Sequence, residues 1–281
     1  VLNGLNTAGF ISGYRGSPVG GYDQQLWNAR KFLENNHIKF QPGLNEDLAA
    51  SAIWGSQQTN LFEGGKYDGV FGIWYGKGPG VDRCGDVFKH GNMSGPSKHG
   101  GVLLIAGDDH AAKSSTVPHQ SEFAFVDASI PVLNPAGVQE ILDYGVLGFE
   151  MSRFSGCWVA FKTTAENMDS SSSIDVSPNR INIELPDFDM PADGLHIRWP
   201  DDWIEQEHRL HNYKLNAVRA FARANGIDKV VMDSSTAKLG IVTTGKSYLD
   251  VRQALEDLGI TEEKADAIGI RLYKIGMPWP L

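Results

Sequence analysis

The sequence predicts an α/β protein with a doubly wound, mostly parallel sheet, followed by the start of a second α/β domain. Short apolar runs typical of buried strands alternate with longer segments in which apolar residues recur at helical spacing. This alternation is typical of a parallel sheet with helices on both faces. With 281 residues, of which 41% are hydrophobic, the chain is large enough for one or two domains with a real core.

The predicted elements follow this alternation along the first half of the chain. Strands are expected at residues 9–12, 70–74, 102–106, 130–133 and 157–161. Helices are expected at residues 22–33, from Glu46 onward and at 138–149. Asn45-Glu46-Asp47 marks a helix start, because Asn is a favoured N-cap and the helix dipole stabilises acids in the first turn.

The amino-acid composition of the sequence changes after residue 168. Four consecutive serines and a stretch dotted with Pro and Asp indicate a linker or extended arm over 169–202. We therefore divide the chain into a first domain (1–168), this arm and a last part (203–281). The last part predicts one long amphipathic helix over 203–225 and then a β-α-β unit with elements at 239–243, 247–258 and 270–275. One such unit cannot cover both faces of a parallel sheet, so we expect this domain to be incomplete and the chain to be a piece of a longer polypeptide.

Composition excludes several classes of function. The chain carries 25 Lys and Arg against 34 Asp and Glu, a net charge of -9, so it lacks the basic surplus that nucleic-acid binding requires. No apolar run approaches the roughly 20 residues of a membrane span. Two cysteines, Cys84 and Cys157, are too few for a disulfide framework or a four-thiolate zinc or iron–sulfur site. We expect a soluble, cytoplasmic protein.

Loops that follow predicted strands are the candidates for chemistry, because ligands usually bind at the carboxyl ends of parallel strands. The glycine-rich turn at 13–21 would let the backbone approach a ligand, although it matches neither the dinucleotide fingerprint nor the P-loop. In the loop at 75–83, Lys77 and Arg83 could hold a carboxylate or phosphate. Glu46 could act as an acid or base in a cleft. Each feature also has a purely structural interpretation. The glycines of 13–21 could only form a tight turn, Lys77 and Arg83 could only be solvated, and Glu46 could only complement the helix dipole.

Several ordered motifs together resemble the thiamine-pyrimidine-binding domain of the 2-oxoacid:ferredoxin oxidoreductases. They are Gly13-Tyr14-x-Gly16-Ser17-Pro18, Asn45-Glu46 before an Ala-rich helix, the segment 107–121 and Ile130-Pro131-Val132-Leu133. The likeness covers about residues 5–165 and is strongest to the large fused form of the indolepyruvate enzymes. The part after about residue 203 is similar to the start of the family's transketolase C-terminal-like domain.

The resemblance implies an oxidoreductase that acts on the oxo group of a 2-oxo acid, with an iron–sulfur protein as acceptor. Glu46 would hydrogen-bond the pyrimidine ring of thiamine diphosphate, and Gly16, Ser17 and Pro18 would lie near the cofactor. The 2-oxo acid would lose carbon dioxide, electrons would reach ferredoxin through iron–sulfur clusters, and coenzyme A would take the acyl group. This chain would hold only the pyrimidine half and would be inactive alone.

The rest of the assembly is implied to lie outside this chain. Magnesium, the diphosphate-binding domain and the iron–sulfur domains would belong to other parts of the parent, which we expect to be a homodimer. Asp109 and Asn134 stand 24 residues apart, as in the family's Gly-Asp-Gly…Asn magnesium motif. Asp109 nevertheless replaces the third position of that motif, and Asn134-Pro135 begins a turn. We therefore expect no metal site here.

The anchor of the substrate carboxylate is left open. Arg15 replaces a Pro common in the family, and Glu122 stands where an Arg is expected. Arg15, Lys77, Arg83 and His119 are all candidates.

Two alternative functions remain at this point. One is a thiamine-dependent decarboxylase or transketolase-type subunit without iron–sulfur chemistry, and the other is a non-catalytic structural subunit. Trp54, Trp74 and Phe123 hint at an aromatic pocket, although aromatic residues are more often core, and the sequence leaves the exact 2-oxo acid open.

Overall fold

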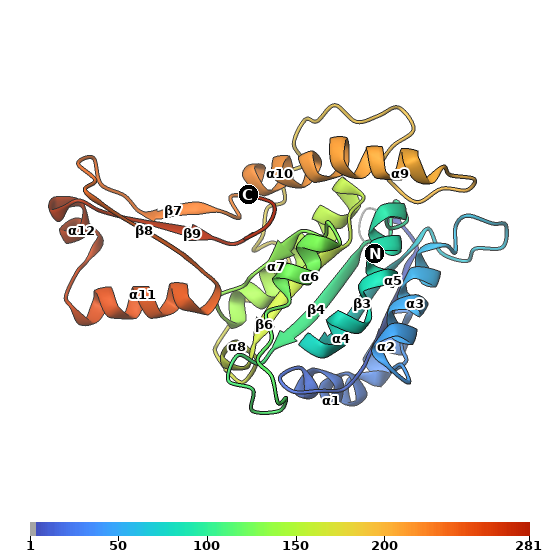
Figure 1. The fold of residues 1–281 in the computed structure, drawn as a ribbon, viewed down its shortest axis with the longest axis horizontal. Coiled ribbons are helices and arrows are strands. Elements are labelled where there is room, and N and C mark those ends of the chain that lie inside the picture. Colours follow the sequence, from blue (N-terminus) through green and yellow to red (C-terminus); the bar gives the residue numbers. More distant parts are fainter. Residues whose placement is uncertain (1–3) are drawn as a thin grey trace.

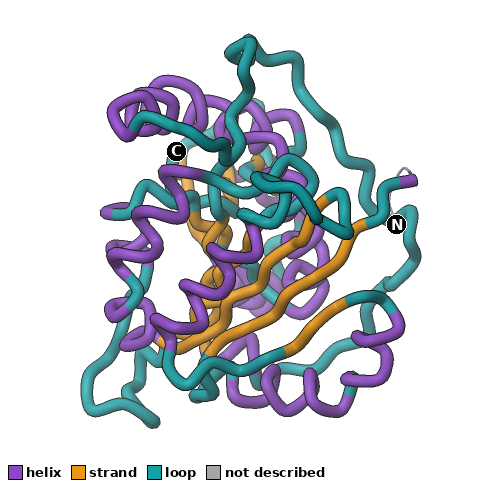
Figure 2. Tube along the Cα trace, turned by 90° about the vertical axis from the view of Figure 1, so that its right-hand side faces the viewer, coloured by secondary structure: helices purple, strands orange, loops and turns teal. Residues whose placement is uncertain are grey.

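The main body of the protein is a six-stranded, all-parallel sheet with helices on both faces (Figures 1 and 2). The computed structural model describes residues 4–281, so the first three residues of the predicted domain 1–168 lie outside the described part. The strand order is β2-β1-β3-β4-β6-β5. The strands are β1 (Thr7–Gly13), β2 (Ile38–Phe40), β3 (Gly69–Lys77), β4 (Val102–Asp108), β5 (Val132–Leu133) and β6 (Val159–Thr164). The predicted fold class is confirmed.

Side chains of the central strands point alternately to two hydrophobic layers. Trp74 and Leu104 face one layer, while Tyr75 and Leu103 face the other, as the period of two in a strand requires. Helices α3 (Glu46–Gln57), α4 (Gly78–Arg83), α5 (Gly85–Ser94) and α6 (Glu122–Asp127) cover the first layer. Helices α1 (Gly20–Asn28), α2 (Arg30–Asn35) and α7 (Val138–Ser155) cover the second, and α8 (Ala165–Met168) follows β6.

Three local features differ from the sequence prediction. The helix expected at 22–33 is two helices that meet at Ala29. The short edge strand β2 was not predicted, because three residues are too few for a period-two pattern. Helix α4 was also missed, because Gly78-Pro79-Gly80 suggests a turn; Pro79 is tolerated in the first helical turn, where its N–H group has no helical partner to lose.

A second, smaller sheet lies beside the main body, on the left of Figure 1. Its order is β7-β9-β8, formed by β7 (Lys229–Met232), β8 (Leu239–Thr244) and β9 (Ile270–Ile275). β8 and β9 are parallel and joined through α11 (Gly245–Asp257) and α12 (Glu262–Ile268), so the expected β-α-β unit is present with an additional helix. β7 is antiparallel to β9 and was not predicted.

The two sheets are connected through residues 169–202, which contain no helix or strand, and a helical segment. This segment consists of α9 (Trp203–Arg209), a π-helical turn (Leu210–Lys214) and α10 (Leu215–Ala224), where the sequence predicts one regular helix. Val218 and Phe221 of α10 pack into the layer that α7 covers. No helix in residues 4–281 has the length and apolar character needed to cross a bilayer.

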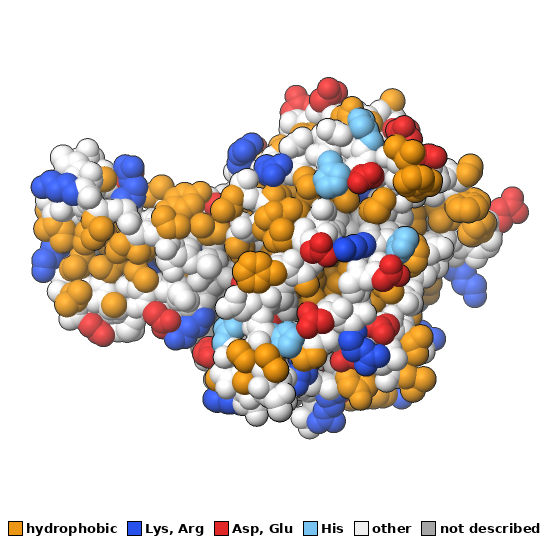
Figure 3. All heavy atoms as spheres, in the orientation of Figure 1, with side chains coloured by type: hydrophobic (Ala, Val, Ile, Leu, Met, Phe, Trp, Pro, Cys, Tyr) orange, Lys and Arg blue, Asp and Glu red, His pale blue; other side chains and the backbone are white. Residues whose placement is uncertain are grey.

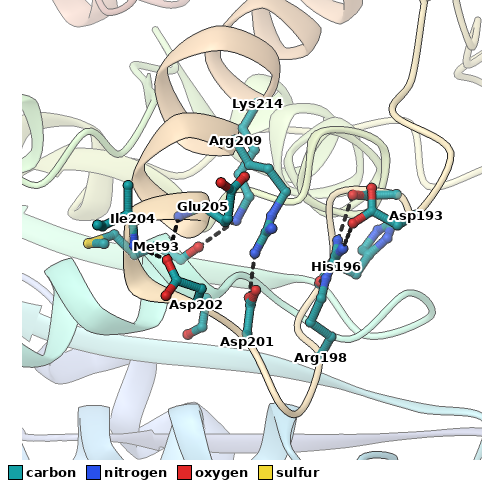
Figure 4. A network of polar contacts seen from close by, with 12 residues as sticks. Met93, Asp193, His196, Arg198, Asp201, Asp202, Ile204, Glu205, Arg209 and Lys214 are labelled. Atoms are coloured by element: carbon teal, nitrogen blue, oxygen red, sulfur yellow. Dashed lines mark hydrogen bonds and ion pairs between the residues drawn. The ribbon is translucent and has the colours of Figure 1, made fainter.

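Lys214, in the π-helical turn, attaches this segment to the main body (Figure 4). Its side chain is completely buried, and its Nζ donates to the backbone oxygens of Asn92 (3.2 Å) and Met93 (2.8 Å). These carbonyls belong to the last turn of α5, where the helix dipole favours a cation. Arg209 pairs with Asp201 just before this turn. Burial lowers the pKa of Lys214 to about 8.

Replacing Lys214 should change how stability depends on pH. Because burial lowers the pKa of Lys214 to about 8 from the ordinary 10.5, the unfolded chain binds more protons than the folded protein between these values. The contribution of Lys214 to the free energy of unfolding should therefore rise with pH in this window, so the stability of the wild type relative to Lys214→Met should be greater at the upper end of the window than at the lower. Urea unfolding of both proteins at pH values of about 7.5 and about 9.5 measures this difference in the free energy of unfolding.

Lys89→Met is the matched control, since Lys89 is half-exposed on α5 and pairs with Asp127. It should leave the pH dependence as in the wild type. Equal pH dependence in Lys214→Met and wild type would show that the buried amine does not titrate in this range.

Candidate functional site

Four loops meet at the carboxyl edge of the main sheet. They follow β1, β2, β3 and β4, which are neighbours in the sheet. The chain passes from β1 to β2 on one side and then crosses to β3 on the other, so the carboxyl ends of β1 and β3 form a topological switch point. Open α/β sheets bind ligands at such points. Figure 3 shows acidic and basic side chains lying side by side on the face that carries α3 and α4.

Glu46 begins α3 at this edge, as the sequence predicts. The Asn45 side chain accepts a hydrogen bond from the Leu48 N–H at 2.9 Å, which caps the helix. The buried indole N–H of Trp74 donates to the Glu46 backbone oxygen at 3.1 Å. The start of the helix is therefore fixed both by its cap and by the strand beneath it, and Glu46 is 8% exposed.

The carboxylate of Glu46 is largely buried but keeps its hydrogen-bonding capacity. Its Oε2 lies 3.6 Å from Arg83 Nη1, which is an ion pair rather than a close hydrogen bond. Arg83 is half-exposed and also contacts Asp47 at 3.3 Å. Within residues 4–281 no group donates a hydrogen bond to either carboxylate oxygen of Glu46. A ligand donor could therefore bind there without displacing an internal hydrogen bond.

Two glycines in the first turn of α4 allow close packing on two sides. A Cβ at Gly80 would lie 2.5 Å from Glu46 Cγ, and a Cβ at Gly78 would lie 2.4 Å from His119 Cβ. Both distances are far below van der Waals contact. Only glycine at both positions lets this turn lie between Glu46 and His119.

His119 contacts Asp82 on the Gly78 side of α4. Its Nε2 lies 2.8 Å from Asp82 Oδ2, and Asp82 is four residues after Gly78, on the same face of the helix. Arg83 is three residues after Gly80 and contacts Glu46 on the other side. Sequence reasoning missed Asp82, because its helical spacing from Gly78 has meaning only once α4 is known to be a helix.

The glycine-rich loop after β1 packs on Lys77. A Cβ at Gly16 would lie 2.8 Å from Lys77 Cδ, and the Lys77 ammonium group donates to the Ser114 backbone oxygen at 3.1 Å. The Ser114 hydroxyl in turn donates to the Ser17 backbone oxygen at 3.4 Å. The loops after β1, β3 and β4 are thus joined next to Gly16 and Ser17, the predicted cofactor-binding residues.

Three of the four candidates for a carboxylate anchor have partners inside the chain. Arg83 contacts two carboxylates, Lys77 donates to Ser114, and His119 pairs with Asp82. Arg15 is exposed and forms no ion pair or hydrogen bond with the residues that the structure describes.

Asp108 and Asp109 both accept hydrogen bonds from other residues of the chain. Asp108 is fully buried and accepts hydrogen bonds from the N–H (2.9 Å) and hydroxyl (2.5 Å) of Ser121, which closes the base of the loop 109–120. Burial raises the pKa of Asp108. Hydrogen bonds from Ser114 lower the pKa of Asp109. No cluster of three or more His, Cys, Asp or Glu side chains within residues 4–281 has the arrangement of a metal site.

Glu122, which stands where an Arg is expected, pairs with the buried Lys162 of β6. Lys162 also lies 3.7 Å from Asp108. A basic side chain thus approaches this region from β6, which no local pattern in the sequence indicates.

Of the three aromatic residues that hinted at a pocket, Trp74 and Trp54 pack in the same hydrophobic core cluster, whereas Phe123 lies on the surface. Trp74 is fully buried in the core, Trp54 donates to Ser94 at 3.1 Å, and Phe123 is 73% exposed. The interpretation of Trp74 as core is the one the structure supports.

Comparisons with known proteins find similarity to indolepyruvate oxidoreductases. The family described as "Indolepyruvate oxidoreductase domain" matches residues 229–281. Indolepyruvate oxidoreductase subunit IorA of Pyrococcus horikoshii is 26% identical over 188 residues, covering 65% of this chain and 28% of that protein. The same subunit of Methanothermobacter marburgensis is 22% identical over 278 residues, covering 97% and 40%.

A solved structure extends the likeness to the whole fold. The 2-oxoglutarate:ferredoxin oxidoreductase of Magnetococcus marinus, solved with 2-oxoglutarate, coenzyme A and succinyl-CoA, superposes with a TM-score of 0.66 at 14% identity. The match covers 98% of this chain and 51% of that one. The chain is thus similar in sequence to the indolepyruvate oxidoreductases and in fold to a 2-oxoacid:ferredoxin oxidoreductase. It spans well under half the length of these two curated relatives.

Filling the space beside Glu46 should destabilise the protein. Gly80→Ala would place a methyl group on Glu46 Cγ, and overpacking of this kind costs about 1–3 kcal/mol in the free energy of unfolding. Gly85→Ala is the matched control, because nothing lies within 4 Å of its Cβ position at the start of α5. It should change stability by less than about 1 kcal/mol. Equal effects of the two substitutions in urea unfolding would contradict the close contact at Gly80.

Proposed function

We propose that this chain provides the pyrimidine-binding half of the thiamine diphosphate site in an indolepyruvate-type 2-oxoacid:ferredoxin oxidoreductase. The observation that carries this proposal is Glu46, a largely buried carboxylate at a helix start that receives no hydrogen bond from the residues described. The reaction is the oxidative decarboxylation of an aryl 2-oxo acid to an acyl-CoA, with ferredoxin as electron acceptor. The names of the curated relatives support the choice of substrate.

The residues at the carboxyl edge fit the pyrimidine half of the cofactor. The carboxylate of Glu46 can accept a hydrogen bond from a ring nitrogen of the cofactor. Because Gly80 has no Cβ, the side chain of Glu46 can keep its position against α4. Gly16, Ser17 and Pro18 lie on the loop that follows β1 at the same edge of the sheet, and we propose that they line the same half. When bound, thiamine diphosphate would provide a nucleophilic carbon and an electron sink for the decarboxylation. The role of Glu46 is to hold a proton between its carboxylate and the pyrimidine ring.

The substrate carboxylate is proposed to bind Arg15. This cation lies on the loop next to Gly16 and has no internal partner among the residues described, whereas Lys77, Arg83 and His119 are already engaged. A guanidinium group can also form two parallel hydrogen bonds with the planar carboxylate of a 2-oxo acid.

The remaining groups of the reaction require other parts of the assembly. Cys84 and Cys157 are the two cysteines of this chain and are both buried, whereas an iron–sulfur cluster is usually held by four thiolates. We propose that the clusters, the magnesium ion and the diphosphate-binding domain are supplied by the rest of the parent, as a homodimer. Two free buried thiols fit a reducing cytoplasm.

Replacing the Glu46 carboxylate should abolish the reaction. Glu46→Gln keeps the size of the side chain but cannot share a proton with the pyrimidine ring, so turnover should fall by about a hundredfold or more. The measurement is viologen reduction by the complete enzyme with thiamine diphosphate, magnesium and coenzyme A, offered indolepyruvate, phenylpyruvate or pyruvate. Asp86→Asn, in the first turn of α5, is the matched control.

Unchanged turnover in Glu46→Gln would place the pyrimidine site elsewhere. Aldehyde release without viologen reduction would favour a decarboxylase without iron–sulfur chemistry, and no reaction with any 2-oxo acid would favour a non-catalytic subunit.

Removing the charge of Arg15 should weaken substrate binding without affecting the cofactor. Arg15→Gln loses a charge-assisted pair with the carboxylate, so KM for the 2-oxo acid should rise about tenfold or more while the affinity for thiamine diphosphate stays the same. Arg30→Gln is the control, because Arg30 pairs with Glu34 on the surface of α2. An unchanged KM in Arg15→Gln would assign the carboxylate to another cation.

A further inference from the structure

The smaller sheet buries only one of its two faces among the residues that the structure describes. Leu272 of β9 lies opposite Met232 of β7 and Ile241 of β8, and this row packs on α11 and α12. Because successive side chains of a strand point to opposite faces, the next residue, Tyr273, points away from these helices. β8 and β9 are parallel, and parallel strands are usually covered on both faces. The face of Tyr273 therefore lacks a cover that such a sheet normally has.

The uncovered face carries a row of apolar side chains. Tyr273 lies opposite Val230 of β7 on one side and Val242 of β8 on the other, so each strand contributes one residue. Val230 is 45% exposed and Val242 is 64% exposed. None of the three belongs to a hydrophobic cluster formed by residues 4–281. Figure 3 shows hydrophobic side chains gathered over the part of the molecule that holds the smaller sheet, on the left of the view. Exposed apolar patches of this kind mark interaction sites.

The two edges of the smaller sheet differ in how well they are protected. β7 begins with the exposed Lys229, and its register shifts between Val230 and Met232. Lysines and bulges keep natural edge strands from pairing with further strands. β8 has the sequence Leu-Gly-Ile-Val-Thr-Thr, a regular register with β9 and neither Lys nor Pro. Because β8 has no partner strand on its outer side within the described residues, it is the edge that can accept another strand.

The handedness of strand crossovers connects the uncovered face with the open edge. A crossover between parallel strands is right-handed in nearly all proteins. The chain runs from β8 to β9 through α11 and α12, which lie on the covered face. A second right-handed crossover, from β9 back to a strand outside β8, would move across the sheet in the reverse direction. Its helix would then lie on the opposite face, over Val230, Tyr273 and Val242.

We propose that this surface binds an amphipathic helix followed by a β-strand, both from the same parent polypeptide. The helix covers the row of Val230, Tyr273 and Val242, and the strand pairs in parallel with β8. This chain spans 28% and 40% of two curated relatives, so both relatives have chain outside the matched region that could provide such a unit. The arrangement requires only a longer parent and is independent of whether that parent oxidises a 2-oxo acid.

A second copy of this chain accounts for fewer of the observations. Two copies related by a twofold axis present the same strand to each other, so their β8 strands would pair in antiparallel orientation. That contact would occupy the open edge but would add no helix to the uncovered face. One connected helix and strand account for both features.

Thiol labelling in the complete parent tests whether the face is covered. In Val242→Cys the introduced thiol should react with a soluble maleimide about a hundredfold more slowly than in Ser247→Cys, because a covered side chain reacts only after local opening. Ser247 is the matched control, since it lies exposed in the first turn of α11. Mass spectrometry of the peptide that contains the introduced Cys separates it from the natural cysteines. Equal rates in the two variants would overturn the proposal.

Hydrogen exchange in the complete parent tests the added strand independently. Every second amide of an edge strand points away from its neighbour in the sheet, so half of the β8 amides face the open edge. A peptide covering residues 239–244 should be protected at all of its amides. A peptide covering 229–232 is the internal control, because the outer edge of β7 should stay free and exchange quickly. Rapid exchange of the outward β8 amides would show that no strand pairs there, and the proposal would be wrong.

A photoreactive group identifies what covers the face. Tyr273→benzoylphenylalanine should cross-link within one polypeptide, to a segment outside residues 1–281. Cross-linking of two copies, seen as a doubled mass on a denaturing gel, would show that a second copy covers the face and would contradict the proposal. If the parent shows the intramolecular cross-link but reduces no viologen with any 2-oxo acid, the proposed function fails and this inference stands.

Discussion

The geometry of the carboxyl edge depends on the absence of two side chains in the first turn of α4. Gly78 and Gly80 lie two residues apart, so they face different sides of the helix, and each allows a functional side chain to pack directly against the backbone. With any larger residue at Gly80, Glu46 would have to move away from the turn. The same substitution at Gly78 would displace the loop that carries His119. A short helix without side chains on these two sides therefore sets the spacing between the two ionisable groups.

At this edge, some charged side chains are paired with other residues of the described chain, and others can still bind a ligand. Arg83 balances the charges of Glu46 and Asp47 from the solvent side, and Asp82 hydrogen-bonds His119. Arg83 approaches Glu46 at 3.6 Å without forming a close hydrogen bond, so it offsets the negative charge and leaves the acceptor positions open.

The main sheet is also tied to the rest of the chain by buried charges. Lys214 places an ammonium group on the last carbonyls of α5, and Lys274 of β9 pairs with Glu140 in the first turn of α7. A buried cation that lost its partner would be costly, so these contacts hold the connecting helix and the smaller sheet to the main body. The site that we propose lies at the opposite end of the strands from Lys214, next to well-packed elements rather than on a hinge.

The sequence by itself determined most of the strands and helices of the main body, and it placed Glu46 at a helix start. Strand and helix alternation, the Asn45 cap and the acids of the first turn are local patterns, and the family resemblance added a role for Glu46. Tertiary structure decided which charged residues are engaged. Asp82 meets His119 across 37 positions and Lys77 meets Ser114 across the same distance, and Lys162 reaches Glu122 from another strand. Such pairs follow from how the loops after neighbouring strands come together, and no spacing within one segment encodes them.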